Sequence, residues 1–118
     1  AGAAPRYDYI CGSTANAALI SFTKAVGSYS TRKNVRVVGI NPGATRTDRL
    51  VRLSEARARE KFGDSSRWPE MLSHLPFGRA AEPEEIADLV VFLASGRASY
   101  LSGCVVDASG GAAFNHAW

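Results

Sequence analysis

Apolar residues recur at three- and four-residue steps in three stretches of the chain, and each stretch predicts a helix. Residues 13–30 form the longest, with Ser13 or Thr14 as the expected N-cap. Residues 47–63 predict a surface helix among arginines, ended by Gly63, and residues 82–94 predict a helix opened by Glu82 and Pro83. The apolar stripe of the 13–30 helix is continuous and comprises Ala15, Ala18, Leu19, Phe22, Ala25, Val26 and Tyr29.

Two short runs of β-branched residues predict buried strands. The first is NVRVVGINPG at residues 34–43, and the second surrounds Val105 and Val106. Pro42 and Gly43 end the first run, since proline cannot donate to a strand ladder and glycine permits a turn. The order α-β-α-α-β predicts an α/β fold with two parallel strands. Two strands leave faces and edges uncovered, so we expect half of a larger doubly wound sheet.

Residues 44–80 are the least regular part of the chain, and a segment at about 45–78 lies within them. They carry a short apolar patch, formed by Trp68, Met71, Leu72, Leu75 and Phe77, between turn signals. A long connection with exposed apolar residues is often a binding loop, so this segment is lid-like. Packing of the same residues into a core is the alternative.

Composition narrows the class of protein. The net charge of +3 comes without a dense basic face or a nucleic-acid-binding motif, so we expect no nucleic-acid partner. No run of 18 apolar residues and no signal-peptide pattern occurs, which favours a cytoplasmic protein away from membranes. Cys11 and Cys104 are too far apart for a metal-ligand motif, and His74 and His116 have no ligand-like neighbours in sequence. We therefore expect reduced thiols and no metal site.

Three stretches, in this order and spacing, carry a family likeness: NPGATRT, PFGRAAEPEEIADLVVFLAS and SYLSGCVVDASGG. The chain resembles the C-terminal half of a short-chain dehydrogenase/reductase, with Ser109 where that family usually has an aspartate. The resemblance implies that residues 1–118 form the C-terminal part of a single Rossmann-type domain. It also implies an NAD or NADP cofactor and a small carbonyl or alcohol substrate. The glycine-rich phosphate loop of the family does not occur in this sequence.

The family's long helix carries a Tyr-x-x-x-Lys pair for proton transfer and ribose binding, and here those positions are Gly12 and Asn16. Tyr9 lies about one helical turn before Gly12 and is the candidate for proton transfer; its alternative role is ring packing at the helix entrance. Asn16 is a candidate ribose contact, or simply a polar residue near the helix N-terminus.

The resemblance also implies cofactor contacts after the first strand. The residues that match this part of the family motif are Pro42, Gly43, Ala44, Thr45 and Thr47. Parallel α/β sheets bind ligands at the carboxyl ends of their strands, which agrees with that location. The alternative is a tight turn in which Thr47 caps the next helix.

Two functions stay open at this point. The first is an oxidoreductase that transfers hydride between nicotinamide and a carbonyl or alcohol with an atypical proton-transfer group. The second is a non-catalytic relative, or a truncated fragment, that acts as a binding or oligomerising protein. Ala17 and Ile20 add apolar surface to a second side of the 13–30 helix, which favours a homo-oligomer through that helix.

Overall fold

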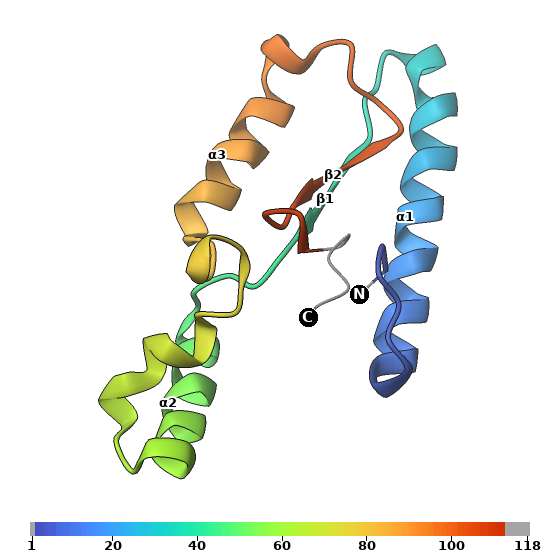
Figure 1. Ribbon diagram of the computed structural model, residues 1–118. Coiled ribbons are helices and arrows are strands. Elements are labelled where there is room, and N and C mark those ends of the chain that lie inside the picture. The colour runs from blue at the N-terminus through green and yellow to red at the C-terminus, as the bar shows by residue number, and fades with distance from the viewer. Residues whose placement is uncertain (1, 113–118) are drawn as a thin grey trace.

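The helices and strands follow one another in the predicted order (Figure 1). The computed structural model describes residues 2–112. Its main elements are α1 (Ile10–Ser30), β1 (Val38–Pro42), α2 (Asp48–Phe62), α3 (Pro83–Ala94) and β2 (Cys104–Ala108). Short 3₁₀ helices lie between them: η1 (Tyr7–Tyr9), η2 (Thr31–Lys33), η3 (Ser65–Leu72), η4 (Pro76–Gly78) and η5 (Gly96–Ala98).

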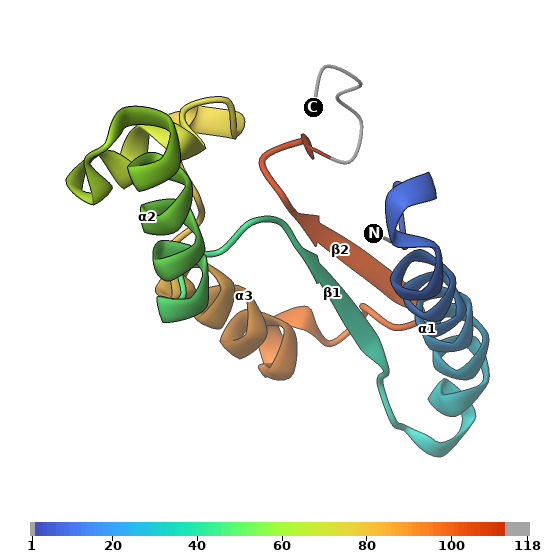
Figure 2. The same cartoon turned by 90° about the horizontal axis from the view of Figure 1, so that it is seen from below.

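The two strands form a parallel pair, as predicted. The register runs from Val38 opposite Cys104 to Pro42 opposite Ala108. Helices α1 and α3 lie on opposite sides of this pair (Figures 1 and 2). This is the layer arrangement of a doubly wound α/β sheet, so the predicted fold class is confirmed.

The N-terminal end of α1 differs from the prediction. The helix begins at Ile10, and Ser13 lies inside it instead of capping it. The Oγ atom of Ser13 accepts a hydrogen bond of 3.1 Å from the backbone N–H of Arg6, which draws the preceding segment back along the helix. Tyr9 is therefore the N-cap residue, although its side chain makes no capping hydrogen bond.

Helix α1 packs on the strands through small residues and not through its apolar stripe. Gly27 is buried against the backbone of Gly103 and Val37. Leu19, Phe22 and Tyr29, which belong to that stripe, are 61%, 60% and 61% exposed. Two strands are too narrow to cover a second face of the helix, so this stripe remains open.

The other helix ends follow the sequence signals. A capping box formed by Glu82 and Glu85 begins α3. Gly63 ends α2 in the left-handed conformation, with its N–H donating to the Arg59 carbonyl at 2.8 Å.

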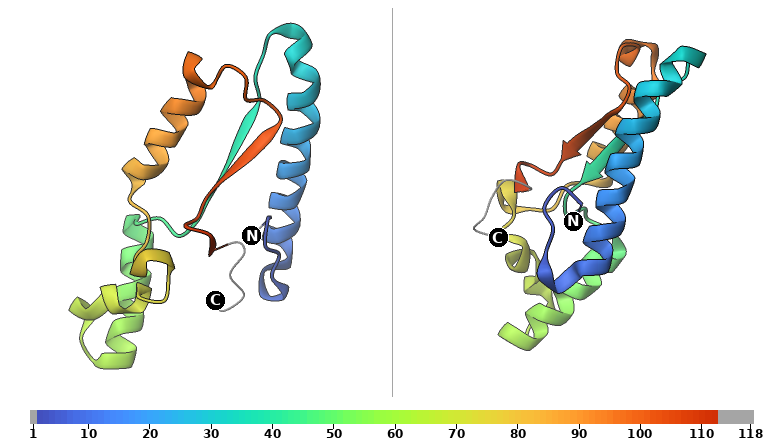
Figure 3. Two further views of the ribbon diagram at one scale, coloured as in Figure 1. Left: turned by 45° about the horizontal axis from the view of Figure 1, so that its top comes forward. Right: turned by 90° about the vertical axis from the view of Figure 1, so that its right-hand side faces the viewer.

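The overall shape is elongated, at 58 × 31 × 21 Å. The radius of gyration of 16.9 Å exceeds the roughly 13 Å expected for a compact chain of this length. Helix α2 and η3 extend away from the strands as a separate arm (Figures 1 and 3). Leu72, Ser54 and Ala58 are buried where η3 packs on α2. Within residues 2–112, no helix is long and apolar enough to cross a membrane.

Candidate functional site

The turn after β1 lies directly beside the end of β2. The N–H of Gly43 donates to the carbonyl of Ala108 at 3.0 Å, which continues the strand ladder by one residue. A Cβ atom at Gly43 would lie 3.0 Å from Cα and 3.2 Å from Cβ of Ser109. Glycine is therefore needed here because two backbones approach closely at the carboxyl ends of the strands.

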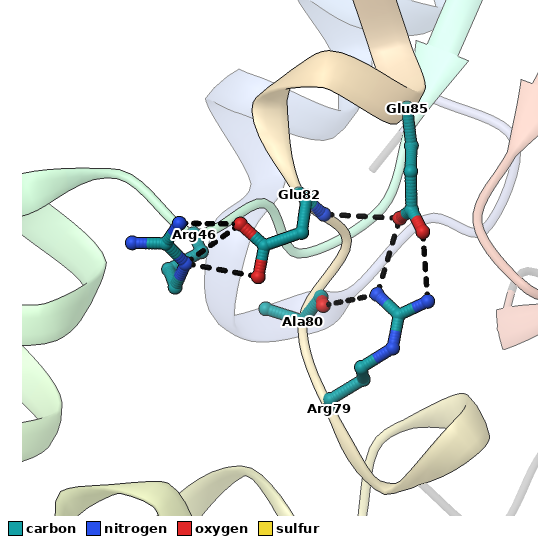
Figure 4. Close-up of polar contacts among 5 residues, drawn as sticks. All are labelled: Arg46, Arg79, Ala80, Glu82 and Glu85. Atoms are coloured by element: carbon teal, nitrogen blue, oxygen red, sulfur yellow. Dashed lines mark hydrogen bonds and ion pairs between the residues drawn. The ribbon is translucent and has the colours of Figure 1, made fainter.

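The segment before α3 holds this turn on its other side. Ala81 donates to the Ala44 carbonyl and accepts from the N–H of Arg46, both at 2.8 Å. Two ion pairs flank this junction, one between Arg46 and Glu82 and one between Arg79 and Glu85 (Figure 4). The turn that carries the predicted cofactor contacts is thus fixed by hydrogen bonds to residues that lie far away in sequence.

These ion pairs lower the pKa of both carboxyl groups below their ordinary value of 4.5. The hydrogen bond from Arg46 is the main cause for Glu82, and the hydrogen bond from Arg79 is the main cause for Glu85. The folded state therefore binds fewer protons than the unfolded state around pH 4.5. The stability from these pairs is present above that pH and is lost as the pH falls through the lowered folded values.

Acidification should therefore lower the melting temperature of the full-length protein, and part of this loss should come from these two pairs. We expect the Glu82→Gln, Glu85→Gln variant to show a shallower decline in melting temperature between pH 5 and pH 3 than the parent protein. Thermal unfolding followed by circular dichroism at several pH values measures it. Parallel curves for variant and parent would refute the assignment.

A cavity of about 380 Å³ opens beside this turn. Its walls are mainly apolar and include Ala44, Leu75, Pro76, Phe77, Ile86 and Ala108. Ser109 also lines it, and the Oγ atom of Ser109 is buried with no hydrogen-bond partner among residues 2–112. A buried hydroxyl without a hydrogen-bond partner costs free energy in the folded state.

Replacing Ser109 with alanine should leave stability unchanged or raise it by about 1 kcal/mol, because the lost hydroxyl makes no bond in the described structure. Ser102 is the matched control, since its hydroxyl accepts from Val37 N–H at 3.2 Å and donates to the Gly27 carbonyl at 2.6 Å. Ser102→Ala should cost about 1–3 kcal/mol. Urea denaturation of both variants measures the difference, and an equal loss in both would contradict it.

The two threonines of the predicted cofactor contact have structural partners. Thr47 caps α2, because its Oγ1 atom accepts from Leu50 N–H at 3.3 Å. The Thr45 hydroxyl donates to the Gly43 carbonyl at 3.1 Å. The capping alternative for Thr47 is therefore observed. The Thr47 hydroxyl proton is still available to a ligand, since its oxygen acts as an acceptor in the cap.

Tyr9 lies against Gly12 at the start of α1. A Cβ atom built on Gly12 would overlap Cε1 and Cζ of Tyr9 and would lie 2.7 Å from its hydroxyl oxygen. The Tyr9 ring thus fills the space that a side chain at residue 12 would enter. Tyr9 as a whole is 57% exposed, so it is partly open to solvent.

Asn16 lies one helical turn beyond Gly12 on α1. Its Nδ2 atom donates to the Gly12 carbonyl at 2.7 Å, and its side chain is otherwise exposed. The side-chain amide of Asn16 therefore points back toward its own helix. Its Oδ1 atom is an acceptor and can take a hydrogen bond from a ligand.

Topology brings Tyr9 and the Gly43 turn to the same end of the molecule. Helix α1 leads into β1 through a short connection and runs antiparallel to it, so the start of α1 lies toward the carboxyl ends of the strands (Figure 1).

Sequence reasoning missed two features of the cavity. Phe77 has a left-handed backbone (φ +59°) and is 86% exposed, although it is neither glycine nor asparagine. Its only sequence signal is its place between Pro76 and Gly78. For Ser109, the sequence did give a signal, because a serine stands there where the family motif usually has an aspartate.

The part of the chain that the structure describes contains no candidate metal site. Residues 2–112 contain no group of three or more His, Cys, Asp or Glu side chains that could hold a metal ion. His116 lies outside the described residues.

Comparison with known proteins agrees with this geometry. Residues 2–113 match the model of a family described as enoyl-(acyl carrier protein) reductase. A 3-oxoacyl-(acyl-carrier-protein) reductase of Aquifex aeolicus is 37% identical over 99 residues, which cover 84% of this chain and 36% of the relative.

Two solved structures extend the likeness to three dimensions. L-sorbose reductase from Gluconobacter frateurii, solved with NADPH and L-sorbose, is 32% identical with a TM-score of 0.74, covering 83% of this chain and 38% of that one. A short-chain oxidoreductase from Pseudomonas aeruginosa PAO1, described as containing an atypical catalytic center, is 31% identical with a TM-score of 0.75, covering 87% and 40%. The chain thus spans well under half the length of the relatives that it matches.

Proposed function

Because this chain belongs to the short-chain dehydrogenase/reductase family, we propose that the protein is an NAD(P)-dependent oxidoreductase that interconverts a small carbonyl compound and its alcohol. The observation that carries the proposal is the cavity at the carboxyl ends of β1 and β2, where sheets of this kind bind their ligands. Its volume falls in the range of about 300–1,000 Å³ that is typical of small-molecule pockets.

The residues of this cavity suit the nicotinamide end of the cofactor. Ala44 and Ile86 offer an apolar wall for a flat ring, and Ser109 lines the same cavity. By the family resemblance, the surrounding contacts come from Pro42, Gly43, Ala44, Thr45 and Thr47. The cofactor would supply or accept the hydride. The 118 residues contain no glycine-rich phosphate loop, so we assign only the nicotinamide end to this chain.

Tyr9 is the residue that we assign to proton transfer. A carbonyl that gains a hydride must also gain a proton at its oxygen, and a phenol can donate one. The Tyr9 hydroxyl lies beside the position where the family keeps its tyrosine. The likeness to the Pseudomonas oxidoreductase, which is described as containing an atypical catalytic center, supports an oxidoreductase with a changed proton-transfer group.

Asn16 replaces the family's lysine and carries no charge. It can still hydrogen-bond a ribose hydroxyl through Oδ1 while Nδ2 donates to the Gly12 carbonyl.

The lid-like segment at about residues 45–78 would cover the substrate. Leu75 and Phe77, at its end, line the cavity, while α2 and η3 pack on each other as an arm. An arm attached mainly through its two ends can move as a unit over the cavity mouth.

The second apolar side of α1 supports a homo-oligomer through that helix. Ala17 is exposed and Ile20 is only half-buried on that side, so both can contact a partner. The simplest partner for this surface is α1 of a second copy of the chain, because most soluble oligomers are symmetric homo-oligomers.

The alternative function is a non-catalytic binding protein, and the loss of the Tyr-x-x-x-Lys pair at Gly12 and Asn16 favours it. Titration of the full-length protein with NADH and NADPH, followed by assays on small ketones and alcohols, separates the two functions. Binding with turnover supports the oxidoreductase, and binding without turnover supports the alternative. Failure to bind either cofactor would refute both and leave the oligomerising role.

A further inference from the structure

Both glycines of α1 mark places where another group comes close to the helix backbone. At Gly27 the neighbours are the backbones of Gly103 and Val37. At Gly12 the neighbour is a side chain, the ring of Tyr9, which belongs to the residue just before the same helix. Glycine is among the least favourable residues in a helix, so its presence in the first turn calls for a reason. The Tyr9 ring is the group that a side chain at Gly12 would displace.

The backbone of Tyr9 is held in place from the preceding turn. The N–H of Tyr9 donates to the Arg6 carbonyl at 3.2 Å. The N–H of Arg6 in turn donates at 3.1 Å to Ser13, which is only 4% exposed and follows Gly12 directly. These hydrogen bonds fix the backbone position of Tyr9. The missing side chain at Gly12 leaves the space that the Tyr9 ring occupies.

We propose that Gly12 is a positioning residue: its missing side chain admits the Tyr9 ring and so sets where the Tyr9 hydroxyl lies at the start of α1. The inference rests on the proposed function, because it gives the hydroxyl a role in proton transfer. Compared with the family pattern, the tyrosine here stands three residues closer to the N-terminus, and residue 12 is a glycine against which its ring lies.

A methyl group at residue 12 should therefore separate activity from stability. The atoms in its way belong to the outer part of a flexible side chain that is 57% exposed, so the ring can swing out at little cost. Alanine also favours the helix more than glycine does. The variant should fold at least as well as the parent protein and still have its hydroxyl in the wrong place.

The test uses Gly12→Ala in the full-length protein and has a readout besides activity. Tetranitromethane nitrates tyrosine at the ring carbons next to the hydroxyl, and one of these, Cε1 of Tyr9, faces Gly12. We expect the rate of Tyr9 nitration, followed by peptide mass spectrometry, to change relative to that of Tyr7, which is 92% exposed and serves as the internal control. We also expect kcat to fall at least tenfold, with an unchanged KM for the nicotinamide cofactor and an equal or higher melting temperature.

Unchanged nitration of Tyr9 in Gly12→Ala would overturn the inference, and so would full activity in a variant whose nitration has changed while Tyr9→Phe is inactive. A lower melting temperature together with lost activity would also overturn it, since it would show a structural role for Gly12. Changed nitration together with an active Tyr9→Phe variant would instead refute the proton-transfer role in the proposed function and leave the packing of Tyr9 on Gly12 standing.

Discussion

Tyr9→Phe is expected to lower kcat by roughly 100- to 10,000-fold, the usual contribution of a positioned proton donor. The substitution removes one oxygen and leaves the ring over Gly12, so α1 and its N-terminal turn should keep their structure. Binding of NADH or NADPH should stay within about twofold of the parent value. Steady-state kinetics and cofactor titration of the full-length protein measure both quantities.

Tyr7→Phe is the matched control for this prediction. Tyr7 lies two residues earlier in η1 and is 92% exposed, so the loss of its hydroxyl should leave turnover unchanged. Equal effects of the two substitutions would argue against a specific role for Tyr9. Full activity of Tyr9→Phe would sink the assignment and direct attention to a water held near Asn16.

Gly27→Ala is expected to destabilise the protein by about 3 kcal/mol, the largest stability effect that we predict. The added Cβ would overlap the backbone nitrogen of Gly103 and would lie 2.8 Å from the Val37 carbonyl oxygen. These atoms are main chain and cannot rotate away. Helix α1 would have to lift from the strands, which would also stretch the bond of 2.6 Å from Ser102 to the Gly27 carbonyl.

Urea denaturation of the full-length protein measures the effect as a lower midpoint with an unchanged slope. Gly96→Ala is the control, because Gly96 has no heavy atom within 4 Å of its built Cβ and an ordinary backbone. A midpoint for Gly27→Ala equal to that of Gly96→Ala would show that α1 is not held at this point.

The regular elements could be predicted from the sequence because their signals are local. Glu82 and Pro83 open α3 and Gly63 closes α2 through contacts within one helical turn. The strands were marked by β-branched runs, although β1 is shorter than the 34–43 stretch that we expected. Val35 lies outside it and is 51% exposed.

The details of the site depend on contacts that sequence spacing does not encode. The start of α1 shifted to Ile10 because Ser13 bonds seven residues back to Arg6 instead of capping the helix. Motif spacing placed Gly12 at the family's tyrosine position, where glycine leaves a space. Only the side-chain geometry shows that the Tyr9 ring fills that space. Ser109, whose hydroxyl is buried, lies close to Gly43, which is 66 residues earlier in the chain.

The pairing of β1 with β2 has a consequence for the order of folding. Asn41 and Asp107, whose side chains bond at 2.8 Å, are separated by 66 residues, and every contact of this ladder spans a similar distance in sequence. By contrast, α2 and η3 are neighbours in the chain and pack on each other after a short turn at Gly63. Closing a long loop costs entropy before any strand contact repays it. The arm should thus form early, and the carboxyl edge with its cavity should be assembled only in the last steps of folding.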